Sequence, residues 1–342
     1  MGNTRRIPAA VVNGTGYGGV EFLRLLRHHP SFEIVEVTAR SEAGKPVEAV
    51  FPHLAGLNLT FSESVSRAEA VFVGLPDAAS ISMIPDLLAA GRRVVDLSAG
   101  FRLRDASLYP RWYGYEHGAA GLLHEAIYGL TEWVRPQLPE ARLVACPGCY
   151  PTATLLALGP AVANHLIEPD IIVDAKSGVS GAGRSLKLSN HFSEANEDVA
   201  AYSLDGHRHQ PEIAQELEHI GGESVRLTFL PHLIPMTRGI LATCYASLRA
   251  GVTERDVRAA YAETYGDEPF VRLTDQSPHT KWTFGSNLCY IHVHYDAQAE
   301  RLLLISAIDN LVKGAAGQAI QCANVMYGLP ETLGLPVEGV YP

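Results

Sequence analysis

The sequence predicts an α/β protein with two domains. The first is a Rossmann-like, doubly wound parallel sheet, and the second is an α+β domain with a mixed, largely antiparallel sheet. Three observations predict this: a glycine-rich turn between an apolar strand pattern and a helix pattern, strand and helix patterns that alternate as far as residue 148, and strand patterns with few helices beyond it.

In the first half, the apolar run from Ile7 to Asn13 ends at Gly14-Thr-Gly-Tyr-Gly-Gly19 and is followed by a helix pattern over 20–29. Further strand patterns cover 32–39, 71–74, 93–97 and 142–145, and a helix pattern covers 81–90. We expect these elements to form an NADP-binding domain over 1–148.

In the second half, an amphipathic helix is predicted after Pro151, from Thr152 onward, and another over 211–220. Strand patterns cover 171–175, 224–230, 239–248, 288–295 and 301–308. The last helix, 311–326, is rich in small residues, which favours close packing against the first domain. We therefore expect a second domain over 149–308, with the segment 309–330 completing the first domain.

The composition is that of a globular protein, with 342 residues, 47% hydrophobic and 19% charged. The 27 basic and 37 acidic residues give a net charge of −10, which argues against nucleic-acid binding. No apolar run reaches roughly 18 residues, so no membrane span is predicted. The N-terminus runs straight into a strand pattern and leaves no room for a signal peptide, and five irregularly spaced cysteines favour a reducing compartment, so a cytoplasmic location is expected.

Cys149 is the strongest candidate for a catalytic residue. It lies in Ala145-Cys-Pro-Gly-Cys-Tyr-Pro-Thr152, where Pro147 and Gly148 favour a tight turn and Pro151 suits a first helical turn. A thiol at a helix N-terminus is close to unpaired N–H groups, which favour the thiolate and can stabilise an oxyanion. This position predicts a nucleophile.

Other interpretations of these cysteines remain open. Cys146 and Cys149 form a Cys-x-x-Cys pair that is compatible with a redox centre or half of a zinc site, and Cys149 is also compatible with an inert buried thiol. The remaining cysteines are scattered singly, so no second metal pair exists and no metal is predicted.

The glycines at 14, 16 and 19 follow a strand and precede a helix, which is the context of a dinucleotide-binding fingerprint. An NAD enzyme usually has an acidic residue at the end of the second strand. Here Arg40 and Ser41 stand at that place, a cation and a hydroxyl suited to a 2′-phosphate. NADP(H) is therefore preferred over NAD(H), with a solvated turn arginine as the alternative.

Two further clusters carry candidate chemistry. His207 and His209 flank an arginine just before a helix and are suited to general acid/base catalysis, although inconsequential surface histidines are the alternative. The glycine-rich loop from Lys176 to Arg184 offers N–H groups and two cations to an anion such as phosphate, or is simply a flexible loop.

Together these features predict one reaction. A thiolate attacks an activated acyl group, phosphate leaves, and a hydride from a nicotinamide cofactor reduces the thioester to an aldehyde.

The sequence resembles the N-acetyl-gamma-glutamyl-phosphate reductases of the aspartate-semialdehyde dehydrogenase-like superfamily. Motifs that match in family order are Gly14-Thr-Gly-Tyr-Gly-Gly19, Asp96-Leu-Ser-Ala-Gly-Phe-Arg102, Pro147-Gly-Cys-Tyr-Pro-Thr-Ala153, Ser177-Gly-Val-Ser-Gly-Ala-Gly-Arg184, His207-Arg-His-Gln-Pro-Glu212, Pro231-His-Leu-Ile-Pro-Met-Thr-Arg-Gly239 and Asp309-Asn-Leu-Val-Lys-Gly314. The resemblance implies an NADPH-dependent oxidoreductase of arginine biosynthesis that reduces N-acetyl-L-glutamyl 5-phosphate, a small molecule. It also implies that 149–308 is a catalytic and oligomerisation domain and that the protein forms a homodimer or homotetramer.

The resemblance also implies roles for individual residues. Cys149 would be the nucleophile, and the acid/base would lie in the His207/His209 pair, with His209 slightly favoured. Arg102, Ser177 and Arg184 would hold the substrate phosphate or carboxylate, and Asn310 would reach the nicotinamide. The cofactor-binding set would be Gly14, Thr15, Gly16, Tyr17, Gly18, Gly19, Arg40, Ser41 and Asn310.

The chain departs from the family pattern at Asn13-Gly14-Thr15 and at Gly100, where the family usually has aspartate. The nearest alternative function is the lysine-branch reductase acting on N-acetyl-aminoadipyl phosphate. An aspartate-semialdehyde dehydrogenase fits the histidine motif less well, and a non-catalytic NADP-sensing regulator is the alternative from another class.

Overall fold

The structure is a computed structural model that describes residues 6–342. The chain forms two compact units, one made of residues up to Gly148 together with Ala315–Leu335, the other of Cys149–Gly314 together with Pro336–Pro342. Residues 1–5, which the sequence analysis placed in the first domain, lie outside the described residues. The chain therefore passes between the units at three points.

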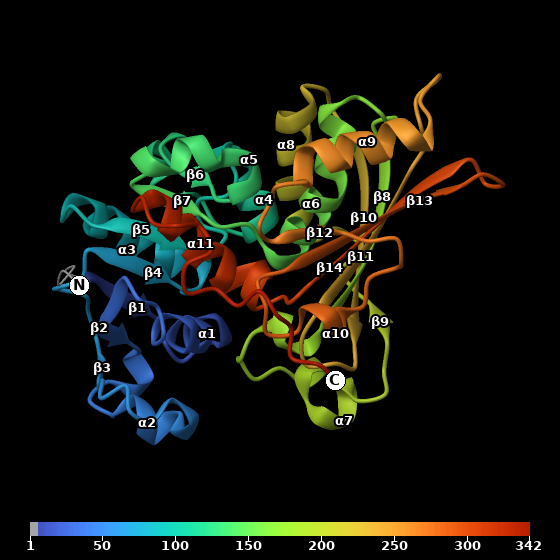
Figure 1. Cartoon of the computed structure of the whole chain (residues 1–342). Helices are drawn as coiled ribbons and strands as arrows, with labels where there is room; N and C mark the ends of the chain where they lie inside the picture. Colours follow the sequence, from blue (N-terminus) through green and yellow to red (C-terminus); the bar gives the residue numbers. More distant parts are fainter. Residues whose placement is uncertain (1–5) are drawn as a thin grey trace. The chain divides into compact units, whose positions relative to one another are not determined.

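The first unit contains a seven-stranded parallel sheet in the order β3-β2-β1-β4-β5-β7-β6 (Figure 1). Its strands are β1 (Ile7–Val12), β2 (Phe32–Thr38), β3 (Phe61–Ser62), β4 (Ala70–Val73), β5 (Arg93–Asp96), β6 (Ile127–Tyr128) and β7 (Leu143–Ala145). Its helices are α1 (Tyr17–Leu26), α2 (Val47–Val50), α3 (Asp77–Ala89), α4 (Tyr109–Tyr113), α5 (Thr131–Val134) and α11 (Gly317–Met326).

Helices cover both faces of this sheet. Ile84 of α3 belongs to the same buried cluster as Val12 and Val73, which lie on one face. On the other face Phe72 packs against Phe22 of α1, with ring centroids 5.1 Å apart. A sheet covered on both faces is typical of doubly wound folds, so the predicted architecture of the first domain is confirmed.

The second unit contains a seven-stranded mixed sheet in the order β12-β13-β14-β11-β8-β10-β9. Its strands are β8 (Asp170–Gly178), β9 (Ala200–Ala201), β10 (Arg226–Ile234), β11 (Ile240–Ala246), β12 (Val271–Leu273), β13 (Cys289–Asp296) and β14 (Arg301–Ile308). Its helices are α6 (Cys149–Ala163), α7 (Phe192–Ala195), α8 (His209–Gly221), α9 (Glu254–Tyr265) and α10 (Thr280–Thr283). Only the β8–β10 and β12–β13 pairs are parallel, which confirms the predicted mixed, largely antiparallel sheet.

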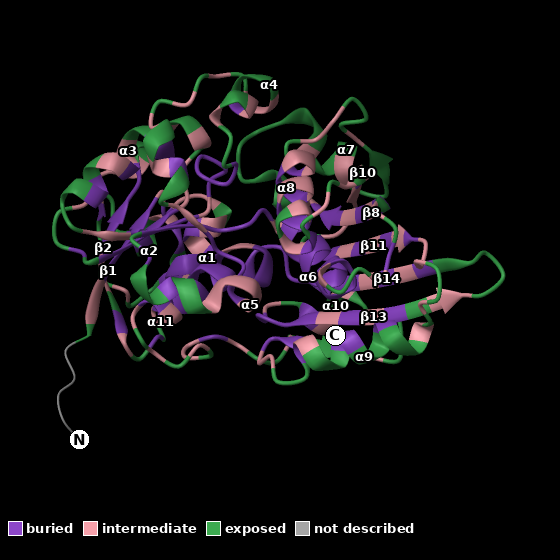
Figure 2. Cartoon of the chain, turned by 90° about the horizontal axis from the view of Figure 1, so that it is seen from above, coloured by how far each residue is buried: buried purple, intermediate pink, exposed green. Residues whose placement is uncertain are grey.

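Helix α6 is buried along nearly its whole length and is not amphipathic, so that prediction was wrong. All residues from Tyr150 to Val162 are buried, as the purple ribbon of α6 in Figure 2 shows. Ser306 of β14 donates a hydrogen bond to the carbonyl of Ala153 (2.8 Å), while Tyr265 of α9 donates to the carbonyl of Leu156 (2.8 Å). The helix lies between the sheet and its covering helices, and so has no solvent-facing side.

The opposite face of this sheet is partly exposed. Along β11, Ala242 and Cys244 on the helix-covered side are fully buried, whereas Thr243 and Tyr245 on the other side are only half-buried. Ile172, which pairs with Tyr245 in the sheet register, is 45% exposed. A partly exposed sheet face that carries apolar side chains such as Ile172 is a candidate surface for contact with another chain.

Several predicted helices differ in their boundaries. Helix α1 begins at Tyr17 and not at residue 20, and α3 begins at Asp77 and not at residue 81. In both helices the first turn precedes the regular apolar pattern. The predicted helix 311–326 consists of a π-helix, Val312–Ala316, followed by α11. No described helix is both long and apolar enough to cross a lipid bilayer.

Candidate active site

Cys149 is the first residue of α6, so its thiol lies in the helical turn whose backbone N–H groups have no helical partner. Pro151 is the third residue of the helix, where its missing N–H costs no hydrogen bond. The Cys149 side chain is half-buried, whereas the other four cysteines are buried. Of the five thiols, this one is best placed to meet a substrate.

Close packing against Gly314 determines the position of Cys149. A Cβ atom on Gly314 would lie 2.8 Å from Cys149 Cβ and 3.2 Å from its Cα. Gly314 lies within the π-helix, in the Asp-Asn-Leu-Val-Lys-Gly motif. Only glycine therefore leaves room for the nucleophile's backbone at this point.

Cys146, the other half of the Cys-x-x-Cys pair, lies in the first unit and is fully buried. Burial and the neighbouring Cys322 thiol raise the pKa of Cys146 well above its usual range. A protonated, buried thiol is a poor redox partner, so this environment argues against the redox alternative.

Cys149 opens onto a cavity of about 690 Å³ within the second unit. That volume suits a small metabolite. Its lining brings together three predicted site residues besides Cys149, namely Ser177, His207 and His209. Much of the remaining wall comes from the segment 181–206, which includes Lys187, Asn190 and Tyr202.

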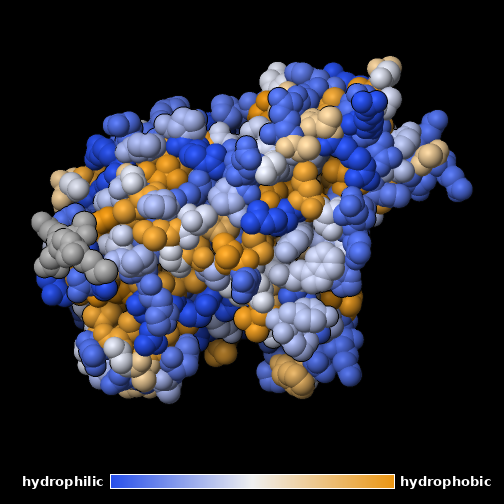
Figure 3. All heavy atoms as spheres, viewed as in Figure 1, coloured by the Kyte–Doolittle hydropathy of each residue, from blue (hydrophilic) through white to orange (hydrophobic). Residues whose placement is uncertain are grey.

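The segment 181–206 also carries large apolar side chains at the surface. Leu186, Leu188 and Phe192 are at least 76% exposed. In Figure 3, hydrophobic atoms appear at the surface in the region where Figure 1 labels α7. The segment thus lines the cavity with mainly polar side chains, whereas its largest apolar side chains are exposed at the surface.

His207 is held in a definite orientation. Its Nδ1 accepts a hydrogen bond from the backbone N–H of His209 (3.1 Å). The centroids of the His207 and His209 rings are 4.7 Å apart. Burial, together with the charge of Arg208, lowers the pKa of His207 to about 4. At neutral pH His207 is therefore uncharged, with its proton on Nε2.

His209 is buried at the start of α8, with 7% of its surface exposed. Its ring lies 5.9 Å from that of Tyr150, the residue after the candidate nucleophile. Both predicted histidines thus share the cavity with Cys149.

Two other predicted residues of this unit have different surroundings. Asn310 is almost fully buried: its Oδ1 accepts from the Gly239 N–H (2.7 Å), and its Nδ2 donates to Ser180 Oγ (2.9 Å). Arg184 is exposed and is not part of the cavity lining. Instead, Lys187 and Arg208 supply the cations of the wall. No motif indicated either residue in this role, although Arg208 stands between the two predicted histidines.

In the first unit, the glycine motif links β1 to α1. Asn13 adopts a left-handed conformation (φ 61°), and its Nδ2 donates to the Gly74 carbonyl (2.7 Å) beyond β4. Gly16 is the N-cap of α1. A Cβ on Gly19 would lie 2.2 Å from the carbonyl oxygen of Asn13, so the helix approaches the strand more closely than a side chain permits. This tight turn below a helix N-terminus is the arrangement that holds a pyrophosphate.

Arg40 and Ser41 begin a short 3-10 helix directly after β2, and both are exposed. The Gly14 N–H donates to the Thr38 carbonyl (2.9 Å), which fixes the glycine turn beside the end of β2. Thr15, Tyr17 and Gly18 lie on the same turn and are not fully buried. The cofactor residues predicted in this unit are thus grouped at the carboxyl ends of β1 and β2.

Arg102 also belongs to the first unit and is 7% exposed. Its Nη2 donates to the carbonyl of Leu97 (2.7 Å). At Gly100, a Cβ would lie 2.9 Å from Ile81 Cγ1. A larger side chain at position 100 would therefore require Ile81 to move.

Asp96, at the end of β5, is a fully buried acid. It accepts hydrogen bonds from the hydroxyls of Ser80 (2.9 Å) and Ser98 (2.6 Å) and from the Ser98 N–H (2.9 Å). Burial outweighs these bonds and raises the pKa of Asp96 to about 6. The folded state consequently holds this proton at pH values where the unfolded chain has lost it.

We expect this proton to make stability depend on pH. Between about pH 4 and pH 6 the folded state binds more protons than the unfolded state, so the free energy of unfolding falls as the pH rises, by on the order of 3 kcal/mol. Urea unfolding at several pH values measures this fall, which Asp96→Asn should remove. Asp86→Asn, at an exposed position, should retain it; a wild-type-like fall in Asp96→Asn would contradict the assignment.

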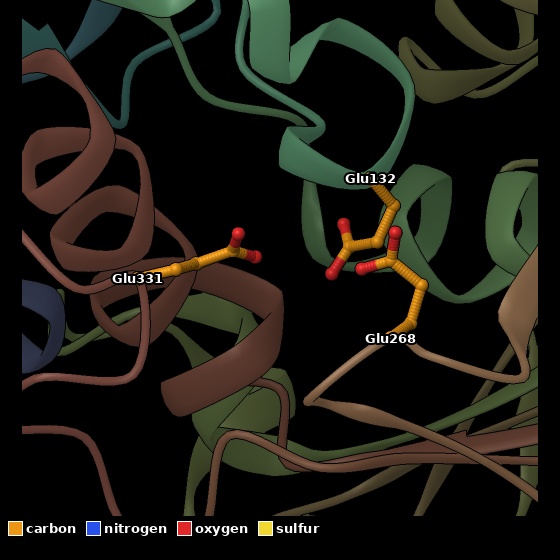
Figure 4. Close-up of side chains that lie close together, drawn as sticks. All are labelled: Glu132, Glu268 and Glu331. Atoms are coloured by element: carbon orange, nitrogen blue, oxygen red, sulfur yellow. The ribbon is translucent and has the colours of Figure 1, made fainter.

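Figure 4 labels three acidic side chains, Glu132, Glu268 and Glu331. In the first unit, the Gln321 amide of α11 donates to Glu132 (3.0 Å) and to Glu331 (2.7 Å), and Glu331 also pairs with Arg135 (2.6 Å). Glu268, the third side chain drawn, belongs to the second unit. The two carboxylates of the first unit thus serve to fasten α11 to the segment around α5.

Comparisons with known proteins agree with this architecture. Residues 8–141 match the family described as semialdehyde dehydrogenase, NAD binding domain, and residues 149–310 match semialdehyde dehydrogenase, dimerisation domain. Aspartate semialdehyde dehydrogenase II of Vibrio cholerae, complexed with ASA, has the same fold, with a TM-score of 0.73 and 16% identity over 95% of this chain and 99% of that one. The enzyme of Candida albicans with NADP gives a TM-score of 0.66 and 16% identity over 94% and 98%.

Relatives closer in sequence extend over the whole chain. An N-acetyl-gamma-glutamyl-phosphate reductase of Dehalococcoides mccartyi is 52% identical over 99% of this chain and all of its own length. Those of Brevibacillus brevis and Heliobacterium modesticaldum are 47% and 46% identical over 98% of this chain and all of their own. The resemblance identified from the motifs is confirmed: the chain belongs to the N-acetyl-gamma-glutamyl-phosphate reductase family, and it contains an NAD(P)-binding domain.

Proposed function

We propose that the protein reduces N-acetyl-L-glutamyl 5-phosphate to N-acetyl-L-glutamate 5-semialdehyde and phosphate, with NADPH as reductant, in arginine biosynthesis. The observation that carries this proposal is the half-buried Cys149 at the start of α6, in one cavity with two imidazoles. Membership of a family of acyl-phosphate reductases supports the substrate class.

In the proposed mechanism the Cys149 sulfur attacks the acyl carbon and forms a C–S bond. The C–O bond to phosphate breaks, and phosphate leaves with the bonding electrons and takes up one proton. NADPH, when bound, supplies the hydride that reduces the resulting thioester. The C–S bond then breaks, its electrons return to sulfur, and the aldehyde is released.

We assign the proton transfers to the His207/His209 pair, with His209 favoured. The low pKa of His207 makes it a hydrogen-bond donor through Nε2 at neutral pH rather than a proton source. Separate His207→Asn and His209→Asn variants distinguish these roles, because loss of the acid/base should change the pH profile of kcat, not only its size.

For substrate binding we keep Arg102, Ser177 and Arg184 as proposed contacts and add Lys187 and Arg208. Ser177 is 2% exposed and lines the cavity with Cys149. Lys187 and Arg208 line the same cavity, as do the acidic residues Glu194 and Asp198. Cations in a cavity wall suit the phosphate and carboxylate of the substrate.

For the cofactor we propose NADP(H), bound by the residues of the glycine turn with Arg40 and Ser41 at the 2′-phosphate. The turn fits a dinucleotide because Gly19 permits the close helix–strand approach that brings backbone N–H groups to a pyrophosphate. Asn310 remains a proposed neighbour of the nicotinamide. Its Nδ2 carries a second N–H besides the one donated to Ser180 Oγ. The same Nδ2 lies close to Gly181, a residue of the cavity lining, at 3.7 Å from the position of a Cβ built there.

We expect Arg40→Asp to weaken NADPH binding by about 100-fold and to leave NADH binding nearly unchanged. The substitution replaces an attractive charge at the 2′-phosphate with a repulsive one, and each 1.4 kcal/mol changes affinity tenfold. Fluorescence titration with both cofactors measures the difference. Lys45→Asp, an equal charge change at an exposed neighbour, is the control; equal losses for NADPH and NADH in Arg40→Asp would reject the assigned contact.

The chain's oligomerisation, which the dimerisation-domain match supports, gives the open sheet face a role. We propose that a second copy covers the face that carries Ile172, Thr243 and Tyr245, giving a homodimer or a homotetramer built from such dimers. Sedimentation equilibrium checks the mass of the oligomer.

We also propose a cytoplasmic location, since all five cysteines are free thiols.

The test of the proposed function is a kinetic comparison of two acyl phosphates. We expect kcat/KM for N-acetyl-L-glutamyl 5-phosphate to exceed that for N-acetyl-aminoadipyl phosphate. A preference for the longer substrate would favour the lysine-branch alternative. Cofactor binding without turnover of either would favour the NADP-sensing regulator.

A further inference from the structure

Two tyrosine hydroxyls form a directed chain beside the nucleophile. The hydroxyl of Tyr150 donates to the carbonyl of His232 (3.1 Å), so its oxygen is left to accept from Tyr202, 3.2 Å away. Burial raises the pKa of both phenols, that of Tyr150 well above its usual value, so both hydroxyls keep their protons at neutral pH.

This chain links three parts of the second unit. Tyr202 follows β9, and its N–H donates to the Pro231 carbonyl (3.1 Å). Tyr150 is adjacent to Cys149 in the first turn of α6, and His232 lies in β10. The hydroxyl chain therefore fastens the turn that carries Cys149 to the sheet on one side and to the segment 181–206 on the other.

The same rings enclose His207. Its imidazole lies 6.0 Å from the ring of Tyr150, 5.6 Å from that of Tyr202 and 5.5 Å from that of Phe229. The Tyr150 and Tyr202 contacts are edge-to-face, at interplanar angles of 84° and 71°. Because edge-to-face contacts are favourable only at particular angles between the rings, they restrict how the His207 imidazole can turn. One pair of tyrosines thus contacts both the turn of the nucleophile and a candidate catalytic histidine.

We infer that Tyr202 is a positioning residue: through Tyr150 it holds Cys149 and His207 in the arrangement in which they share one cavity. The inference rests on the proposed function for its catalytic meaning. Tyr202 performs no chemical step, because its hydroxyl is directed to Tyr150.

Tyr202→Phe tests this inference, since it removes the hydroxyl and keeps the ring. We expect kcat to fall about fivefold to tenfold with KM changed less than about twofold, as for the loss of one hydrogen bond that aligns reacting groups. A second readout needs no substrate. The pH at which iodoacetamide alkylation of Cys149 reaches half its maximal rate should move upward, because a less firmly held turn stabilises the thiolate less.

Tyr265→Phe is the matched control. Tyr265 also donates a buried hydroxyl to a carbonyl of α6, that of Leu156, but one well beyond the turn of Cys149. It should lose comparable stability and keep both kcat and the alkylation profile. The inference is overturned if Tyr202→Phe keeps both wild-type readouts, or if Tyr265→Phe changes them equally. Absence of reductase activity in the wild type would instead reject the proposed function, and the alkylation profiles would still test the positioning.

Discussion

Cys149→Ser is expected to lower kcat by roughly 10⁴-fold or more, which is the scale of losing a covalent nucleophile. Serine has nearly the same shape, but its hydroxyl stays protonated at neutral pH, and an ester is harder to reduce by hydride than a thioester. Stopped-flow or steady-state measurement of NADPH oxidation with the acyl phosphate gives the loss. NADPH affinity should stay within about twofold of wild type.

The control for this variant is Cys244→Ala. Cys244 is a fully buried thiol of β11 in the same unit and is not part of the cavity lining. We expect Cys244→Ala to be somewhat less stable and to turn over normally. If Cys149→Ser retained a substantial fraction of wild-type turnover, the thioester mechanism would be refuted.

Gly19→Ala is expected to weaken NADPH binding on the order of 100-fold and to lower the stability of the first unit by about 1–3 kcal/mol. The new methyl group would stand 2.2 Å from the Asn13 carbonyl oxygen, so the strand end or the start of α1 must move. That movement takes the backbone N–H groups away from the pyrophosphate. Isothermal titration and thermal unfolding measure the two effects.

Gly121→Ala is the matched control, because no atom lies within 4 Å of the position its Cβ would take. It should leave both affinity and stability close to wild type. Wild-type affinity in Gly19→Ala would show that the turn does not bind the cofactor as proposed.

Elements with a strong local pattern were predictable from the sequence. The apolar runs of β1, β4 and β5 and the alternating pattern of β2 gave strands close to their observed bounds, because buried parallel strands are short and largely apolar. Strands β3, β6 and β9 have two residues each, too few for a periodic pattern, and depend on pairing with a neighbour. Helix α9 was missed although Thr253 and Asp256 form a capping box at its start.

The candidate site was predictable only in part. Motifs identified Cys149 and both histidines, and the cavity brings them together. Lys187 and Tyr202 come from an irregular segment whose course depends on tertiary contacts, so no local pattern indicated that they reach the same cavity. The burial of α6 could not be read from its composition either, because a helix rich in small and apolar residues suits both a partly and a fully covered position.

The discontinuity of the first unit has a consequence for biosynthesis. Its sheet is complete by β7, yet α11 supplies Gln318, whose amide donates to the Gly129 carbonyl (3.1 Å), and the Met326 carbonyl, which accepts from Arg93 (2.5 Å). On the ribosome the N-terminal 148 residues must wait for the last helix to emerge before these bonds can form. Nascent chains arrested before residue 315 should accordingly be easier for a protease to digest within their N-terminal half than the released full-length chain.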